Sequence, residues 1–113
     1  MRFLLVILLF FYNVALTQSL DINTKKGYAA HGYDVVAYFN NEAIEGDKNH
    51  SAIFEGVTYK FSSEANLNTF IENPVKYIPQ YGGYCAYAVA LKSDKVSINP
   101  KTFLIVDGKL YLF

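Results

Sequence analysis

The first nineteen residues constrain the fold most, because they have the pattern of a segment that is removed before the domain folds. MRFLLVILLFFYNVALTQS carries one early positive charge, Arg2, followed by an apolar run from Phe3 to about Leu16. Small and polar residues end the segment, so a cleavage site fits between Thr17 and Ser19. This order of regions is typical of a secretory signal peptide. We therefore expect residues 1–19 to be a signal peptide.

The same apolar run limits how the chain meets a membrane. A helix that crosses the hydrocarbon core needs about 20 apolar residues, and the run from Phe3 to Leu16 is shorter. We expect no stable membrane span after cleavage, with an uncleaved N-terminal anchor as the alternative. Residues 20–113 suit one small domain. We expect this domain to be exported, to a periplasm or to the extracellular space.

The exported domain has to fold without an internal disulfide. Small secreted domains are often stabilised by disulfides, but Cys85 is the only cysteine of the sequence. Nine of the ten tyrosines and six of the nine phenylalanines lie in residues 20–113 and compensate, since each aromatic side chain buries a large area. Cys85 itself is either a buried, inert residue or a free thiol.

The charge balance argues against nucleic acid as a partner. Ten lysine and arginine residues match ten aspartates and glutamates, and Arg2 is the only arginine. Nucleic-acid backbones are bound by clustered basic surfaces, usually with arginines. A near-neutral domain fits a small ligand, a metal ion or another protein better.

Three segments have the composition of β-strands. GYDVVAYF (32–39) is dense in β-branched and aromatic residues and is expected to be the first strand. NNEAIEGDKNH (40–50) is polar and is expected to be a loop. AIFEGVTYKF (52–61) predicts a hairpin that turns at Glu55-Gly56, and TFLIVDGKLYLF (102–113) predicts another at Asp107-Gly108, a preferred type I′ pair.

A helix is expected between these hairpins. In SSEANLNTFIEN (62–73) the serines can cap the N-terminus, and Leu67, Phe70 and Ile71 form a helical apolar stripe. Pro74 is expected to end this helix. YCAYAVAL (84–91) is apolar on both faces and fits a buried strand or a short helix. The elements together predict a small single α+β domain, with antiparallel β-hairpins packed on one central helix.

The stretch HSAIFEGVTYKFSSEANLNTFIENPVKYI (50–78) closely resembles the YHS domain, a module named for a recurrent tyrosine, histidine and serine. These three residues match Tyr59, His50, and Ser62 or Ser63. Further landmarks of the module follow in register at Gly56, Phe61, Phe70, Pro74 and Tyr77. The flanking GYDVVAYF, PQYGGYCAYAVA and DGKLYLF are similar to the stand-alone exported bacterial branch of the family. The resemblance implies a YHS-like domain over nearly all of residues 20–113.

The resemblance also brings a suspected metal role. Some YHS domains carry two cysteines around the start of the helix, and the matching positions here are Ser62 and Asn66. Neither residue offers the thiolate or imidazole that copper(I) and zinc select. A copper or zinc cofactor is thus implied by resemblance only, with Cys85 and His50 as candidate ligands. Exported relatives usually continue past DGKLYLF with a helical segment, so the resemblance implies a chain truncated at its C-terminus.

Cys85, in QYGGYCAYAVA, is the centre of the expected site. A thiolate needs a nearby cation, helix N-terminus or metal to lower its pKa, and no basic residue lies within six positions of Cys85. Its small apolar neighbours favour packing. The resemblance favours redox or metal chemistry, because some exported relatives are selenoproteins with selenocysteine at this position. His50 is expected to be an exposed loop imidazole or, through its match to the family histidine, a ligand.

The remaining site candidates are tyrosines that could line a pocket near Cys85: Tyr59, Tyr84 and Tyr87. His31 is expected at the surface, and Asp34 is expected to cap or orient a loop. No phosphate-binding glycine loop, HExxH motif or recognisable catalytic triad occurs, so enzymatic activity is not favoured. We expect an exported, non-enzymatic binding module for a metal ion, a small molecule or another protein. The alternative is a thiol-based redox or copper-handling protein that uses Cys85, assisted by His50.

Overall fold

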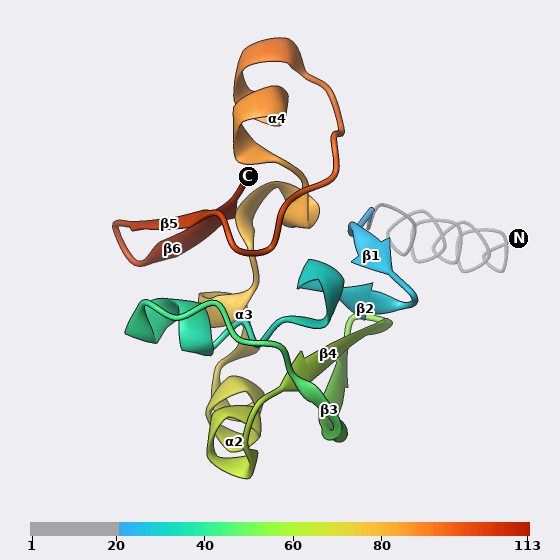
Figure 1. The fold of residues 1–113 in the computed structure, drawn as a ribbon, viewed down its shortest axis with the longest axis vertical. Coiled ribbons are helices and arrows are strands. Elements are labelled where there is room, and N and C mark those ends of the chain that lie inside the picture. Colours follow the sequence, from blue (N-terminus) through green and yellow to red (C-terminus); the bar gives the residue numbers. More distant parts are fainter. Residues whose placement is uncertain (1–20) are drawn as a thin grey trace, which may run out of the picture.

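The computed structural model describes residues 21–113. The expected signal peptide, residues 1–19, lies outside the described residues. No helix among residues 21–113 is long and apolar enough to cross a membrane. The described chain contains a four-stranded sheet, a separate two-stranded hairpin and several short helices (Figure 1).

The four-stranded sheet has the order β1-β2-β4-β3. β3 (Asp47–Phe54) and β4 (Val57–Phe61) form the expected antiparallel hairpin, and β2 (Tyr28–Ala29) pairs with β4 in parallel beside β1 (Thr24–Lys25). The hairpin turns at Glu55 and Gly56, which both have positive φ, as a type I′ turn requires. β3 starts at Asp47, so the end of the expected loop 40–50 is strand.

The prediction of a first strand over residues 32–39 is wrong. Its residues form a turn followed by the short 3-10 helix η2 (Ala37–Asn40), after another 3-10 turn, η1 (Ala30–Gly32). The cause is Asp34, whose Oδ1 accepts hydrogen bonds from the backbone N–H groups of Val36 and Ala37. An aspartate that bonds its own backbone competes with strand pairing and favours a turn.

The expected helix is confirmed as α2 (Glu64–Glu72). Ser63 is its N-cap, and the Ser63 hydroxyl accepts a hydrogen bond from the Asn66 N–H at 3.1 Å. Phe70 is buried, whereas Ile71 is 57% exposed, so the core-facing stripe is narrower than expected. The helix ends before Pro74, which starts the short helix α3 (Pro74–Tyr77) at a position where its missing N–H costs nothing.

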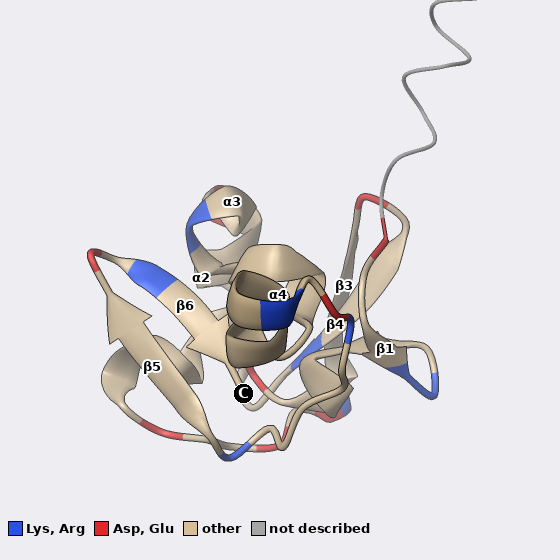
Figure 2. Cartoon of the chain, turned by 90° about the horizontal axis from the view of Figure 1, so that it is seen from above, with Lys and Arg blue, Asp and Glu red and all other residues tan. Residues whose placement is uncertain are grey.

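The last third of the chain contains η3 (Gln80–Gly83), α4 (Ala86–Lys92), β5 (Phe103–Val106) and β6 (Lys109–Leu112). Of the two alternatives for 84–91, the short helix is correct. The β5–β6 hairpin is confirmed, with Asp107 and Gly108 both at positive φ. This hairpin packs on η2, α3 and η3, and α4 lies beside it in both views (Figure 1, Figure 2).

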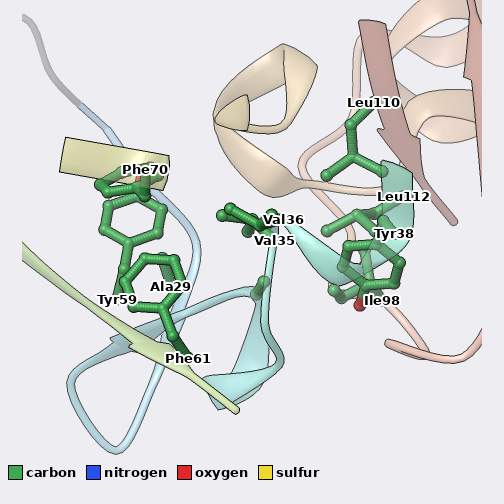
Figure 3. Close-up of a cluster of buried hydrophobic side chains, with 11 residues drawn as sticks. Ala29, Val35, Val36, Tyr38, Tyr59, Phe61, Phe70, Ile98, Leu110 and Leu112 are labelled. Carbon is green, nitrogen blue, oxygen red and sulfur yellow. The ribbon is translucent and has the colours of Figure 1, made fainter. Parts of the chain in front are cut away.

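The buried core runs through both parts of the molecule. Phe70 of α2 stacks on Tyr59 and Phe61 of β4, with ring centroids 5.0 Å apart in each pair. Leu110, Leu112, Tyr38 and Ile98 form a second group, and Val35 and Val36 lie between the two groups (Figure 3). The expected small α+β domain is therefore confirmed, although α2 packs on the β3–β4 hairpin and not on both hairpins.

Candidate functional site

Cys85 is the N-cap residue of α4, but its side chain makes no capping hydrogen bond. Its backbone N–H donates to the Val96 carbonyl at 2.8 Å, and its carbonyl accepts from the Val89 N–H. The side chain is half-buried and packs against the core. Cys85 therefore connects α4 to the loop that follows it through backbone bonds, while its thiol contributes packing.

The Gly-Gly pair before Cys85 serves the chain itself. Gly82 and Gly83 have φ of 63° and 80°, a region that favours glycine. A Cβ on Gly82 would lie 2.5 Å from the Asp21 carbonyl oxygen. The Asn23 N–H donates to the Gly82 carbonyl at 2.8 Å. The pair therefore lets the first described residues cross closely over η3.

An apolar groove of about 400 Å³ lies between α4 and the β5–β6 hairpin. Tyr87 and Leu91 of α4 line one side and are 56% and 66% exposed. Leu104 and Val106 of β5 line the other side and are 52% and 42% exposed. The other lining residues are Tyr81, Ala86, Ala90, Tyr111 and Phe113. Of the expected site residues, Tyr87 lines this groove, and Cys85 immediately precedes its lining residue Ala86.

The β5 strand is apolar on both faces. Phe103 and Ile105 pack against the core, while Leu104 and Val106 alternate with them and face the groove. Antiparallel strands with one solvated face usually carry polar residues on that face. The outer face of β5 instead carries apolar side chains, as is typical of a face that is covered by another surface.

Tyr84 lies in a polar cluster and not in the apolar groove. Its hydroxyl donates to the Asp21 carboxylate at 3.0 Å, and the same carboxylate binds the Lys95 ammonium. The hydrogen bond to Asp21 raises the pKa of Tyr84, and the Lys95 and Tyr84 hydrogen bonds lower the pKa of Asp21. The cluster borders a cavity of about 350 Å³ that is lined also by Tyr81, Val89, Ser93 and Asp94.

Tyr59 is buried, with 3% of its surface exposed. Burial raises the pKa of its hydroxyl to about 12. Its ring packs on Phe70, and part of it borders a cavity of about 130 Å³ that also contacts Ile78. This volume is below the range of about 300–1,000 Å³ typical of ligand pockets. Tyr59 is therefore a core residue with little room for a ligand.

The structure does not bring Cys85 and His50 together as a metal site. His50 lies on β3 and is half-buried, so it is in a strand and not in the expected loop. β3 and α4, which follows Cys85, lie toward opposite ends of the view in Figure 1. Among residues 21–113, no group of three or more histidine, cysteine, aspartate or glutamate side chains could hold a metal ion.

Ser62 and Asn66 converge on Asp34. The Asp34 Oδ2 accepts hydrogen bonds from the Ser62 N–H at 2.8 Å, the Ser62 hydroxyl at 2.7 Å and the Asn66 amide at 2.8 Å. The other carboxylate oxygen accepts two backbone N–H groups at 2.9 and 3.1 Å. Asp34 is fully buried. These two positions therefore join α2 and β4 to the 34–37 turn.

Comparisons with known proteins place no further constraint on the site. No family model, curated protein or solved structure matches this chain.

Proposed function

We propose that the protein is an exported, non-enzymatic binding module, whose ligand is an extended apolar segment of another protein. The groove between α4 and the β5–β6 hairpin is the binding surface. The observation that carries the proposal is the alternation in β5, where Leu104 and Val106 face the groove on the side opposite to the core. Contiguous exposed apolar patches on small proteins commonly mark interaction sites.

The composition of the groove supports a protein partner. Tyrosine and other aromatic residues are enriched at protein interfaces, where charged residues are depleted. Tyr81, Tyr87, Tyr111 and Phe113 line the groove, and none of its lining residues is charged. The groove is largely open to solvent, which suits a chain segment lying in it better than a small molecule enclosed on all sides.

The backbone of β5 supports an extended conformation for that segment. Among the described strands, β5 pairs only with β6, so its outer edge has no strand partner. An unpaired edge can accept an added strand through main-chain hydrogen bonds, while pockets for alternate side chains give specificity. An added strand would continue the face formed by Leu104 and Val106.

Selection of random peptides displayed on phage, with residues 20–113 immobilised, tests the proposal. We expect enriched peptides with apolar residues at alternate positions. Their affinity should fall at least tenfold in Leu104→Lys and in Leu91→Asp, because each change places a charge in the apolar contact. Ile53→Lys is the matched control, since Ile53 is 74% exposed on β3, outside the groove. Circular dichroism verifies that all three variants fold.

Two results would overturn the proposal. Selected peptides that bind Leu104→Lys as tightly as the unchanged protein would place the binding surface elsewhere. A dimer seen by analytical ultracentrifugation, and dissociated by Leu104→Lys but not by Ile53→Lys, would mean that a second copy of the chain covers the groove.

A further inference from the structure

A second cavity, outside the apolar groove, is rich in positive charge. It has a volume of about 380 Å³ and is formed by the β1–β2 hairpin, η1, β4 and residues 33, 45 and 100. Lys25, Lys26 and Lys60 line it together with the His31 imidazole, and Glu45 is the only carboxylate among its lining residues. Blue segments lie on β1 and on β4, on the same side of the molecule (Figure 2). Three of the nine lysines of an otherwise neutral chain therefore face one small space.

Lys60 is held in place toward this cavity. Its Nζ lies 4.2 Å from the centroid of the Tyr28 ring, a cation–π contact. Its stem passes over Gly32, where an added Cβ would be 2.9 Å from the Lys60 Cε. Gly32 also has a φ of 82°, so a side chain is disfavoured there on two grounds. The ammonium is thereby restricted in position before any ligand arrives, which lowers the entropy cost of binding.

His31 adds an imidazole whose pKa depends on the charges around the cavity. Its Nε2 lies 3.1 Å from the Ser97 hydroxyl, which also accepts from the Asn23 amide at 3.4 Å. Burial, and next the positive charge of Lys25, lower the pKa of His31. The other titratable groups around the same cavity are Lys26, Lys60, Tyr28, Tyr33 and Glu45. An anion placed among the lysines would counteract the effect of Lys25 on His31.

We propose that this cavity binds a small molecule that carries a phosphate group. Three ammonium groups and one carboxylate leave two positive charges, which match the charge of about −1.5 to −2 on a phosphate monoester at neutral pH. The rings of Tyr28, Tyr33 and Pro100 supply walls for an organic part. The volume lies within the range of about 300–1,000 Å³ typical of small-ligand pockets.

Titration with phenyl phosphate in a chloride buffer, followed by the NMR signals of the His31 ring, tests this assignment. We expect saturable binding and a rise in the pKa of His31 when the ligand is bound. Lys60→Gln should weaken binding by about tenfold, because a charge-assisted hydrogen bond is lost. Lys25→Gln, at an exposed strand residue that can change without disturbing the core, should weaken it similarly.

Matched controls separate a site from general attraction to positive charge. Lys109→Gln removes the same charge at an exposed residue of β6 that does not line the cavity, so its affinity should be unchanged. Equal losses in Lys109→Gln and Lys60→Gln would overturn the proposal. So would a His31 pKa that stays constant at saturating phenyl phosphate, or benzoate binding as tight as that of phenyl phosphate.

Discussion

Cys85 is the N-cap residue of α4, but its side chain makes no capping hydrogen bond. Sulfur is a weak hydrogen-bond acceptor, and the thiol packs against the core instead. His50, the candidate ligand that the sequence paired with Cys85, is on β3. The sequence left two interpretations of Cys85 open, a packing residue and a reactive thiol. The structure favours packing.

Two substitutions at Cys85 should therefore differ in stability. Cys85→Ala should lower the free energy of unfolding by about 1 kcal/mol, because it removes the sulfur atom that packs against the core. Cys85→Ser replaces the sulfur with a smaller hydroxyl that can cap the helix, so its stability should be nearly unchanged. Urea unfolding of both variants measures the difference. A Cys85→Ser variant less stable than Cys85→Ala would contradict this account.

Cys85→Ser also tests the thiol-based alternative. If Cys85 handled copper, copper(I) uptake would be lost in Cys85→Ser while the fold is retained. We expect uptake, measured by competition with a chromogenic chelator, to be the same in Cys85→Ser and in the unchanged protein.

At the scale of elements, patterns with local causes were predictable. Both hairpins turn at the expected dipeptides, and α2 begins after the expected serine and ends before Pro74. The structure of segment 32–39 was not predictable from β-propensity, because the hydrogen bonds of one aspartate, Asp34, outweigh the strand preference of its neighbours. Asp34 was expected to orient a loop, but its partners Ser62 and Asn66 are 28 and 32 residues away and carry no sequence signal.

Asp34→Asn tests whether this carboxylate determines the local structure. The amide keeps the size of the side chain but turns one acceptor into a donor, which then faces N–H or O–H groups. We expect a loss of about 3 kcal/mol or more in the free energy of unfolding, since buried donors to a charged acceptor lose their partner. Urea unfolding followed by circular dichroism measures it.

Asp107→Asn is the matched control for Asp34→Asn. It makes the same chemical change at a turn position of positive φ, where Asn-Gly is as favourable as Asp-Gly. Its stability should stay within about 0.5 kcal/mol of the unchanged protein. Equal stabilities of the two variants would show that the hydrogen bonds of Asp34 contribute nothing.

The fold of the whole molecule brings together residues that lie far apart in the sequence. Lys60 is 35 residues beyond Lys25, and only the parallel pairing of β2 with β4 brings both to one cavity. The overall charge balance of the chain did not indicate that lysines would gather at one cavity. No periodic pattern in the sequence indicates it either. The apolar groove was easier to anticipate, because Tyr81 and Tyr87 lie within four residues of Cys85 in the sequence, although its second wall comes from β5.

The two halves of the core also predict how the molecule responds to alkali. Tyr38 and Tyr59 are buried in different halves, and burial raises the pKa of each above its usual value of about 10. Because the folded state favours the neutral hydroxyl, the stabilisation is fully present below about pH 10. It is lost as the pH rises through the folded-state value, which for Tyr59 is about 12.

We therefore expect the protein to unfold cooperatively above pH 10, with Tyr38 and Tyr59 ionising as the structure is lost. Tyrosinate absorbance and circular dichroism, recorded on one sample across the pH range, should show a shared transition. Tyr59→Phe keeps the ring that packs on Phe70 but removes the ionising group. The pH at which half of the Tyr59→Phe protein is unfolded should be higher, because only one of the two buried tyrosines can then destabilise the folded state by ionising. An unchanged midpoint would mean that Tyr59 ionises without opening the core.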